Sequence, residues 1–268
     1  MSAPANASRR RWWRRRAAAA RRSLPKGLRG WPARVGAGAG IAAAVVLLTA
    51  TSASAAGPGF YAVTGTLHHA FPVLSTGALT QGVVDDSVFP LSTTGSGVNR
   101  LPFPLRAFNQ TYQNAAVSSN GFLVLGTTAG QVPSAPNNAC LPTGDFGHPL
   151  VAAYWRDLTM NAPEARNPFP DGIFVRTAGT APHRTFTVSW QGEEFSTDRP
   201  VLAQVVFGEG SQNFAFLYGT SALPAATVGV QSKQQLTWTE WSCDLVHDPG
   251  VTAGLRVSAV HRNGVQPA

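Results

Sequence analysis

The strongest constraint on the fold is an alternating stretch, RTFTVSW, at residues 184–190. Phe186, Val188 and Trp190 fall on one side of an extended chain, and the Thr and Ser residues between them fall on the other. Successive side chains of a β-strand point to opposite faces of its sheet, so this period of two predicts a half-buried strand. The segment therefore indicates a sheet with one face on a hydrophobic core.

Two hairpins and several shorter strands extend this pattern. Residues 201–219 contain two apolar runs joined by a cluster of turn formers, and Asn120-Gly121, a pair that readily adopts positive φ, joins apolar runs at 115–118 and 122–125. Further strands are expected at 150–155, 172–176, 227–231, 235–243 and 254–260. No segment after residue 60 has a helical period of adequate length. Short strands broken by many of the 27 Gly and 20 Pro residues predict an all-β fold, an antiparallel β-sandwich.

The first 55 residues differ in composition from the rest. The whole chain carries 21 basic and 13 acidic residues, a formal charge of +8, but residues 1–55 hold eleven of the basic residues and no acid, which leaves a formal −3 for the remainder. An apolar run starts at Val35 after the arginines and has Ala53-Ser54-Ala55 near its end. A basic region, an apolar run and an A-x-A site in this order are typical of a signal peptide. We therefore predict an exported protein, secreted or at the cell surface.

Other roles for this leader stay open. Residues 35–56 are long enough to span a bilayer, so an uncleaved leader would anchor the protein, with its arginines on the cytoplasmic side near anionic headgroups. The stretch SRRRWWR at residues 8–14 resembles the twin-arginine export motif, so either export route is compatible with the sequence. Interleaved Arg and Trp can also bind nucleic acid, but no basic face continues in the rest of the chain, and no nucleic-acid partner is expected.

The chain divides into four predicted parts: a basic region with a signal peptide or membrane anchor at 1–55, a lead-in at 56–77, the sandwich at 78–262 and a short tail at 263–268. Cys140 and Cys243 are the only cysteines, and both follow the leader. An oxidising compartment favours a disulfide between them, and two separate buried thiols are the alternative. The bridge would close a loop of about 100 residues and contribute about 4 to 5 kcal/mol through chain entropy.

A series of sequence blocks resembles a known extracellular domain. The first blocks are Asp85-Asp86-Ser87, the LPFPL run at 101–105, Tyr112 and the Ser-Asn-Gly turn at 119–121. The later blocks are HPLVAAYWRDLTM (148–160), RTFTVSWQG (184–192), the hairpin at 201–219 and ATVGVQS (226–232). From about residue 78 to 260 the chain resembles the nidogen-type (NIDO) domain. The resemblance implies an extracellular module with an adhesive or matrix-related role, and it gives structural motif positions to Asp86, Tyr112, Asn120, Gly121, Trp190 and Gly229.

The sequence contains few patterns of catalytic residues. It has no Gly-x-Ser-x-Gly elbow, and none of its six histidines forms a zinc-binding pattern, so neither a cofactor nor serine hydrolysis is expected. Asp157 is the best acidic candidate, because it follows the end of an apolar strand, where loops present functional groups. It has three possible roles: structural pairing, Ca²⁺ binding, or glycan hydrolysis together with Glu193 or Glu194.

Aromatic residues suggest a binding surface. Trp238 and Trp241 lie three positions apart in a predicted strand, so they point to opposite faces, with one buried and the other exposed. The exposed one is predicted to form an aromatic platform with Tyr218 or Trp155, close to Asp157, for a sugar or a protein. We therefore predict a non-catalytic, exported interaction module that binds an extracellular protein or glycan. A secreted glycan-acting hydrolase is the alternative.

Overall fold

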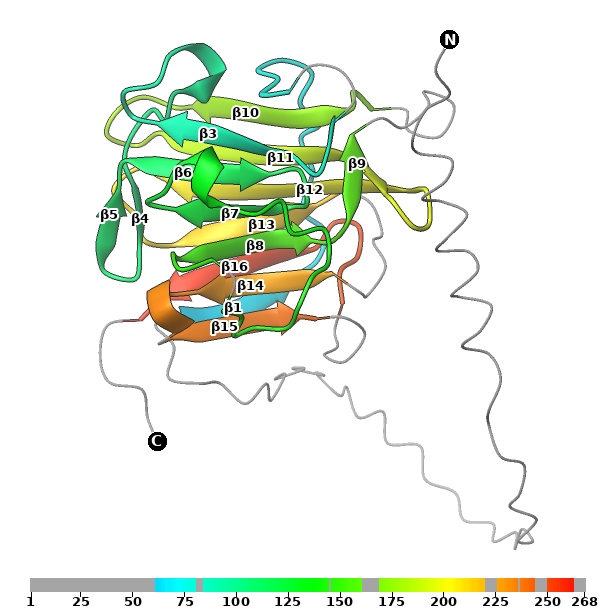
Figure 1. Ribbon diagram of the computed structural model, residues 1–268. Helices are drawn as coiled ribbons and strands as arrows, with labels where there is room; N and C mark the ends of the chain where they lie inside the picture. The colour runs from blue at the N-terminus through cyan, green and yellow to red at the C-terminus, as the bar shows by residue number, and fades with distance from the viewer. Residues whose placement is uncertain are drawn as a thin grey trace, which may run out of the picture. The chain divides into compact units, whose positions relative to one another are not determined.

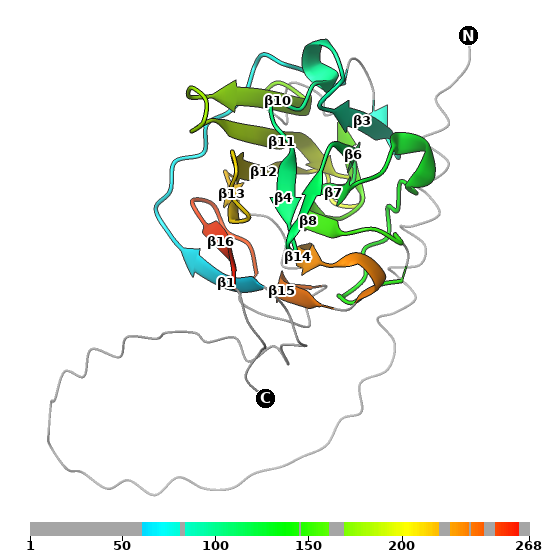
Figure 2. The same ribbon diagram turned by 90° about the vertical axis from the view of Figure 1, so that its left-hand side faces the viewer.

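Two antiparallel sheets form the fold, and Figures 1 and 2 show them as two layers. The computed structural model describes residues 61–80, 84–144, 146–160, 169–219, 226–235, 237–243 and 250–262. The larger sheet has eight strands in the order β1-β16-β13-β12-β11-β9-β2, with β10 also paired to β11. The smaller sheet has six, in the order β15-β14-β8-β7-β6-β3, and β4 and β5 form a separate hairpin.

The strands of the larger sheet are β1 (Tyr61–Thr66), β2 (Val84–Asp85), β9 (Leu158–Met160), β10 (Gly172–Ala178), β11 (Thr185–Glu194), β12 (Arg199–Gly208), β13 (Phe214–Tyr218) and β16 (Arg256–His261). Those of the smaller sheet are β3 (Val88–Ser92), β6 (Asn114–Ser118), β7 (Phe122–Leu125), β8 (Leu150–Trp155), β14 (Thr227–Gln231) and β15 (Trp238–Ser242). The separate hairpin is β4 (Leu105–Ala107) and β5 (Gln110–Tyr112). Three 3₁₀ turns complete the described elements: η1 (Gly97–Asn99), η2 (Ala129–Gln131) and η3 (Lys233–Gln235).

The main core lies between the two sheets. Phe186, Val188 and Trp190 of β11 point inward and belong to one apolar cluster with side chains such as Val151 and Ala153 of β8. The register of β11 against β12 places Trp190 opposite Ala203, so the inward residues of neighbouring strands share this face. The alternation in the sequence reflects this packing, and the predicted all-β antiparallel sandwich is confirmed.

Both outer faces of the sandwich are covered as well. A second apolar cluster covers the outside of the smaller sheet, where Phe122 and Trp155 pack against Phe146 from a long connection. We call this connection the disulfide strap; it comprises residues 126–149 apart from 145. The outside of the larger sheet is covered by residues 67–80, the N-terminal strap, which is the cyan trace that leaves β1 and runs past β13, β12 and β11 toward β10 in Figure 2.

The N-terminal strap corrects one expectation from the sequence. The polar side of residues 184–190 was expected to face solvent, as in a half-buried strand. Ser189 is instead fully buried, together with Gln191 of the same strand and Gln204 of β12. Gln191 bonds to the main chain of the strap, and Gln204 Nε2 donates to the strap and to Ser189 Oγ, whereas Gln204 Oε1 has no hydrogen-bond partner among the described residues. The polar face of β11 is therefore an internal surface.

The predicted lead-in also contributes to the sandwich. Within residues 56–77 the structure has β1, which pairs with β16 from Tyr61↔His261 to Thr66↔Arg256 and forms one edge of the larger sheet. The sandwich thus includes residues that precede 78. The leader, at 1–55, and the tail, at 263–268, lie outside the described residues. Among the described residues, no helix has the length and apolar character that a bilayer crossing requires.

Candidate functional site

An acidic corner forms where the chain crosses from one sheet to the other. The connection from β2 to β3 passes through Asp86, and the connection from β8 to β9 passes through Asp157. Asp85 belongs to β2, and carboxylate oxygens of Asp85, Asp86 and Asp157 lie within 4.8 Å of one another. All three residues are partly exposed. The acidic corner, defined as these three aspartates, thus combines two sequence blocks that are about 70 residues apart.

Asn120 holds the two crossing connections together. Its side-chain Nδ2 donates to Asp86 Oδ1 at 3.0 Å and to the Ser134 carbonyl at 2.9 Å. Its Oδ1 accepts from the backbone N–H of Leu158 at 2.9 Å, and its main-chain carbonyl accepts from Arg156 N at 3.2 Å. Asn120 is fully buried, so these bonds satisfy groups that water cannot reach. Asn120, which was predicted as a turn residue, therefore also links three segments through its side chain: the β2–β3 connection, the β8–β9 connection and the disulfide strap.

Gly121 allows the backbones to approach closely at this turn. It has φ of +80°, and a Cβ at this position would collide with the carbonyl oxygen of Tyr154. The Gly121 carbonyl accepts from the N–H groups of both Ala153 and Tyr154, at 3.1 and 2.9 Å. A larger residue would meet both a steric clash and an unfavourable backbone conformation. The Asn-Gly pair is thus required by the contact of the turn with β8.

Two buried glutamates lie on the neighbouring strand. The register places both Asp85 of β2 and Glu193 of β11 opposite Thr159 of β9, so the three side chains share one face of the larger sheet. Glu193 and Glu194 are each only 1% exposed. Glu194 pairs with Arg156, with 2.7 Å between Oε1 and Nε, and accepts from the Thr197 hydroxyl at 2.5 Å. Glu194 therefore serves to fix the connection between β8 and β9.

The structure shows two places where ligand-type side chains gather among its described residues. The first is Cys140 with Glu240 and Cys243, but its two sulfurs are bonded to each other and cannot bind a metal as thiolates. The second is the acidic corner, which offers up to three carboxylates to a cation. Ca²⁺ takes six to eight oxygen ligands, so the corner would supply part of such a shell. The chemistry of its donors fits Ca²⁺ and not the nitrogen and sulfur preferences of zinc.

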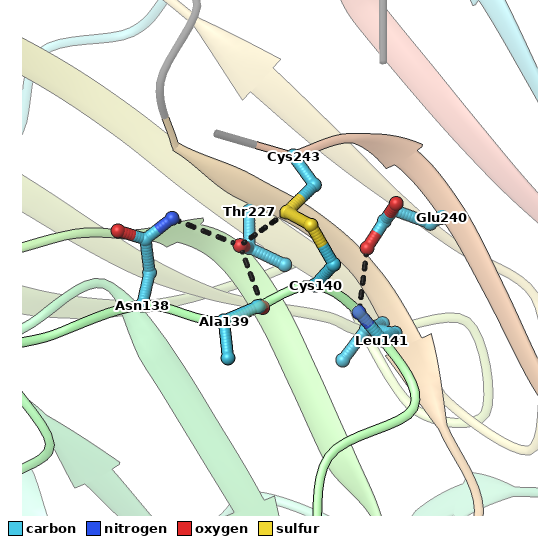
Figure 3. The surroundings of a disulfide bond; sticks show 7 residues. All are labelled: Asn138, Ala139, Cys140, Leu141, Thr227, Glu240 and Cys243. Atoms are coloured by element: carbon cyan, nitrogen blue, oxygen red, sulfur yellow. Dashed lines mark hydrogen bonds between the residues drawn. A yellow bond between two sulfur atoms is a disulfide. The ribbon is translucent and has the colours of Figure 1, made fainter. Parts of the chain in front are cut away.

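The disulfide between Cys140 and Cys243 joins the disulfide strap to the end of β15 (Figure 3). Glu240 of β15 accepts from Leu141 N at 2.7 Å on one side of the bridge. Thr227 of β14 lies on the other side, where its hydroxyl bonds to the Ala139 carbonyl at 2.9 Å. The predicted bridge is confirmed. It fixes a strap that covers the aromatic cluster around Trp155.

The predicted aromatic platform is not assembled. Trp155 is fully buried and donates its indole N–H to the Ala135 carbonyl, and Tyr218 is 1% exposed and donates to the Ala153 carbonyl. Trp238 and Trp241 are both half-buried and pack on opposite sides of β15, Trp238 against the outer cluster and Trp241 against the inner one. Neither Trp155 nor Tyr218 can therefore contribute to a surface. Their apolar bulk fills the interior.

The remaining motif residues occupy packing positions. The ring of Tyr112 lies against Gly126, where a Cβ would meet its Cδ1 at 2.9 Å, and burial raises the pKa of Tyr112. Gly229 lies at register shifts of β14 against both of its neighbours, and a Cβ there would meet the Thr239 carbonyl at 2.5 Å. Trp190 donates its indole N–H to the Ser118 carbonyl at 2.8 Å. The motif blocks thus mark contacts between the sheets and their connections.

Buried glutamines that were not predicted from the sequence hold the two straps. Gln191 pairs with both the N–H and the carbonyl of Leu74 in the N-terminal strap, and Gln231 pairs in the same way with Thr143 in the disulfide strap. Both glutamines continue the outer side of a predicted strand: Gln191 lies two residues after Ser189 of the 184–190 alternation, and Gln231 is the last residue of the strand predicted at 227–231. Their position could have indicated a covering segment, since a long amide side chain on a covered sheet face needs main-chain partners.

A family model described as NIDO related matches residues 53–258, which is most of the chain and all but the last residues of the described sandwich. The chain belongs to the NIDO-related family. The nidogen-like resemblance of the sequence blocks is therefore confirmed. No curated protein and no solved structure matches the chain at a significant level.

Membership places this NIDO-related domain among modules that are typically extracellular and generally non-catalytic. The disulfide is consistent with such a setting, because disulfides form and persist in oxidising compartments.

Proposed function

We propose that this NIDO-related domain is an exported, non-catalytic module that binds an extracellular protein or glycan. Adhesion or a matrix-type contact is the role that best fits a single disulfide-linked sandwich of this family. Export would depend on the basic and apolar leader in residues 1–55, and retention of residues 35–56 would leave the module tethered to the membrane.

The main support for this proposal is that the candidate carboxylates form bonds within the fold or are buried in it. Glu194 is held by Arg156 and Thr197, and Glu193 is 1% exposed, so a polymeric substrate would not reach either group. Asp86 is held by Asn120, which itself links three segments of the backbone. These side chains stabilise the crossing of the sheets, and the burial of Glu193 and Glu194 supports a scaffold better than an open catalytic cleft.

The alternative, a glycan hydrolase acting through Asp157 with Glu193 or Glu194, requires two carboxylates that flank an accessible glycosidic bond. Asp157 is partly exposed, but both possible partners are buried. The alternative therefore has little support. It predicts turnover that Asp157→Asn removes while the fold stays intact.

The direct test is a binding screen of the secreted protein against extracellular proteins and glycans, with a hydrolase panel run on the same samples. We expect saturable binding to at least one partner and no turnover. Trp238→Ala and Asp157→Asn probe the half-exposed aromatic and the acidic corner, and Asp171→Asn, another partly exposed acid, is the matched control. Turnover in the wild type and its loss in Asp157→Asn alone would contradict the proposal.

Ca²⁺ binding at the acidic corner is a separate hypothesis. The thermal unfolding midpoint should rise with millimolar Ca²⁺ if the three aspartates bind the ion, because a ligand that binds only the folded state stabilises it. Asp86→Asn should remove this shift, whereas Asp171→Asn should retain it. An equal midpoint with Ca²⁺ and with a chelator would exclude the site.

A further inference from the structure

The disulfide joins one partly exposed cysteine to one buried cysteine. Cys140 lies in the disulfide strap and is partly exposed, between a partly exposed Ala139 and a buried Leu141. Cys243 directly follows β15 and is fully buried. A thiol from solution must reach the sulfur atom that it attacks, so access decides which of the two sulfurs reacts. The burial of the two cysteines therefore favours attack at Cys140.

A hydroxyl group lies next to the buried sulfur. Thr227 places its Oγ1 at 3.6 Å from Cys243 Sγ, and Figure 3 shows it across the bridge from Glu240. The same hydroxyl accepts from Asn138 Nδ2 at 3.1 Å and lies 2.9 Å from the Ala139 carbonyl. A hydroxyl hydrogen rotates to suit its acceptors, so it can turn from this carbonyl to the sulfur when negative charge develops there. A thiolate formed on Cys243 would thus receive a hydrogen bond from β14.

We propose that the bridge is a thiol-exchange site, in which Cys140 accepts an external low-molecular-weight thiol and Cys243 is the leaving group. The thiolate of the external thiol attacks Cys140 Sγ, and a new S–S bond forms as the Cys140–Cys243 bond breaks. The electron pair of the broken bond leaves on Cys243 Sγ, which then takes a proton from water. One disulfide replaces another, so the exchange consumes no further oxidant or reductant. The product is a mixed disulfide on Cys140.

Glu240 limits the rate of this exchange. Its carboxylate lies within 4.8 Å of both sulfurs and accepts from Leu141 N at 2.7 Å. The residue is 2% exposed, so water screens its charge poorly. A negative charge at this place repels the attacking thiolate and the leaving thiolate alike, which slows the exchange and leaves Cys140 as the attacked residue. Glu240→Gln removes the charge and retains an oxygen that can accept from Leu141.

The disulfide strap stays in place for the bridge to form again. Side chains of β14 and β15 bind the main chain of the strap at Ala139, Leu141 and Thr143, on both sides of Cys140. These bonds do not involve sulfur, so the exchange leaves them intact. Cys243 then has a high effective concentration next to the mixed disulfide and can expel the external thiol. The exchange is therefore local and reversible, and it does not depend on the partner binding proposed above.

The test uses the full chain and reduced glutathione as the external thiol. The folded protein is incubated with excess glutathione, the reaction is stopped in acid, which removes thiolates, and the peptides are mapped by mass spectrometry. We expect at least about tenfold more glutathione adduct on Cys140 than on Cys243, because Cys243 is buried. The same reaction in urea is the matched control, since the unfolded chain exposes both sulfurs and the two adducts should form in similar amounts.

Variants of two acidic residues test the effect of charge on the rate. Glu240→Gln should speed adduct formation on Cys140 about tenfold, because the repulsion of thiolates is removed. Asp171→Asn, at a partly exposed acid next to β10 of the other sheet, should leave the rate unchanged. If Glu240→Gln does not fold, the wild type is compared with two thiols of opposite charge. The cationic thiol cysteamine should then react faster than glutathione by a ratio that decreases in urea.

Similar amounts of adduct on the two cysteines of the folded protein, or an excess on Cys243, would overturn the proposal. A folded protein that forms no adduct until urea unfolds it would also overturn it, because the exchange would then require global unfolding. An unchanged rate in a folded Glu240→Gln protein would overturn the effect assigned to this carboxylate. Partner binding is measured separately, so its failure would affect the proposed function and leave the exchange result unchanged.

Discussion

Trp190 of the larger sheet donates its indole N–H to the carbonyl oxygen of Ser118 in the smaller sheet, at 2.8 Å. Tyr218 makes a second bond of this kind, from its hydroxyl to the Ala153 carbonyl at 2.6 Å. Both side chains are buried between the sheets. The two layers are therefore joined by directed hydrogen bonds from aromatic side chains as well as by apolar packing.

Removal of these donors should destabilise the domain. Tyr218→Phe leaves the Ala153 carbonyl without its side-chain donor and should lower the free energy of unfolding by about 1 kcal/mol, and Trp190→Phe, which also removes apolar volume, by about 2 to 4 kcal/mol. Urea unfolding monitored by circular dichroism measures both. Equal stability of Tyr218→Phe and the wild type would show that the bond contributes nothing.

The disulfide should contribute more than any single hydrogen bond. Cys140 and Cys243 are 103 residues apart in sequence, so their bond restricts a long loop of the unfolded chain. The Cys140→Ser/Cys243→Ser protein should lose about 2 to 5 kcal/mol of unfolding free energy, and the disulfide strap should become the first segment to exchange its amide hydrogens. Hydrogen exchange with mass spectrometry tests this order. Earlier exchange in the N-terminal strap would contradict it.

Gly121 and Gly210 provide a matched pair of substitutions. Both have positive φ, +80° and +69°, but a Cβ at Gly121 would collide with the Tyr154 carbonyl, whereas Gly210 has open space around it. Gly210→Ala should lower the free energy of unfolding only by the cost of placing Ala at positive φ, about 1 to 2 kcal/mol. Gly121→Ala should cost clearly more, and should also disturb the acidic corner that its turn supports. Equal unfolding midpoints for the two variants would refute the steric argument.

His261 should make stability depend on pH. Burial disfavours the charged imidazolium and lowers the pKa of His261 below its ordinary value of 6.5. The unfolded chain therefore binds a proton more readily than the folded one, and stability should fall as the pH drops from about 6.5 to the folded pKa. Urea midpoints at about pH 7.5 and 5.5, compared with those of His261→Gln, isolate this contribution. A larger decrease of the urea midpoint between these two pH values in His261→Gln than in the wild type would contradict this prediction.

The alternation of Phe186, Val188 and Trp190 was sufficient to predict a strand and its inward face. It was not sufficient to predict what lies on the other face, because a period of two shows which residues share a side and contains no information about what covers them. Ser189 was therefore expected to be exposed, and it is buried together with Gln191 under the N-terminal strap. The short strands β2 and β9, of two and three residues, have no period to detect.

The assembly of the acidic corner could not be predicted from the sequence either. Asp86, Asn120 and Asp157 were each identified from separate sequence blocks, and Asn120 was expected to form a turn. Their meeting depends on two connections that cross between the sheets side by side, which is a property of the topology. Trp155 and Tyr218 were each considered as a member of a surface platform, and Trp155 also as a side chain that fills the space between the sheets, since a large aromatic in a strand is compatible with either face until the register is known.

Export of the domain and its closure by a disulfide can be tested together by the intact mass of the protein from culture fluid and from membranes. Samples should be measured with and without reduction and alkylation. We expect a soluble species that begins close to Ala56 and gains alkyl groups at Cys140 and Cys243 only after reduction. A full-length, cell-retained species that is alkylated without reduction would contradict it.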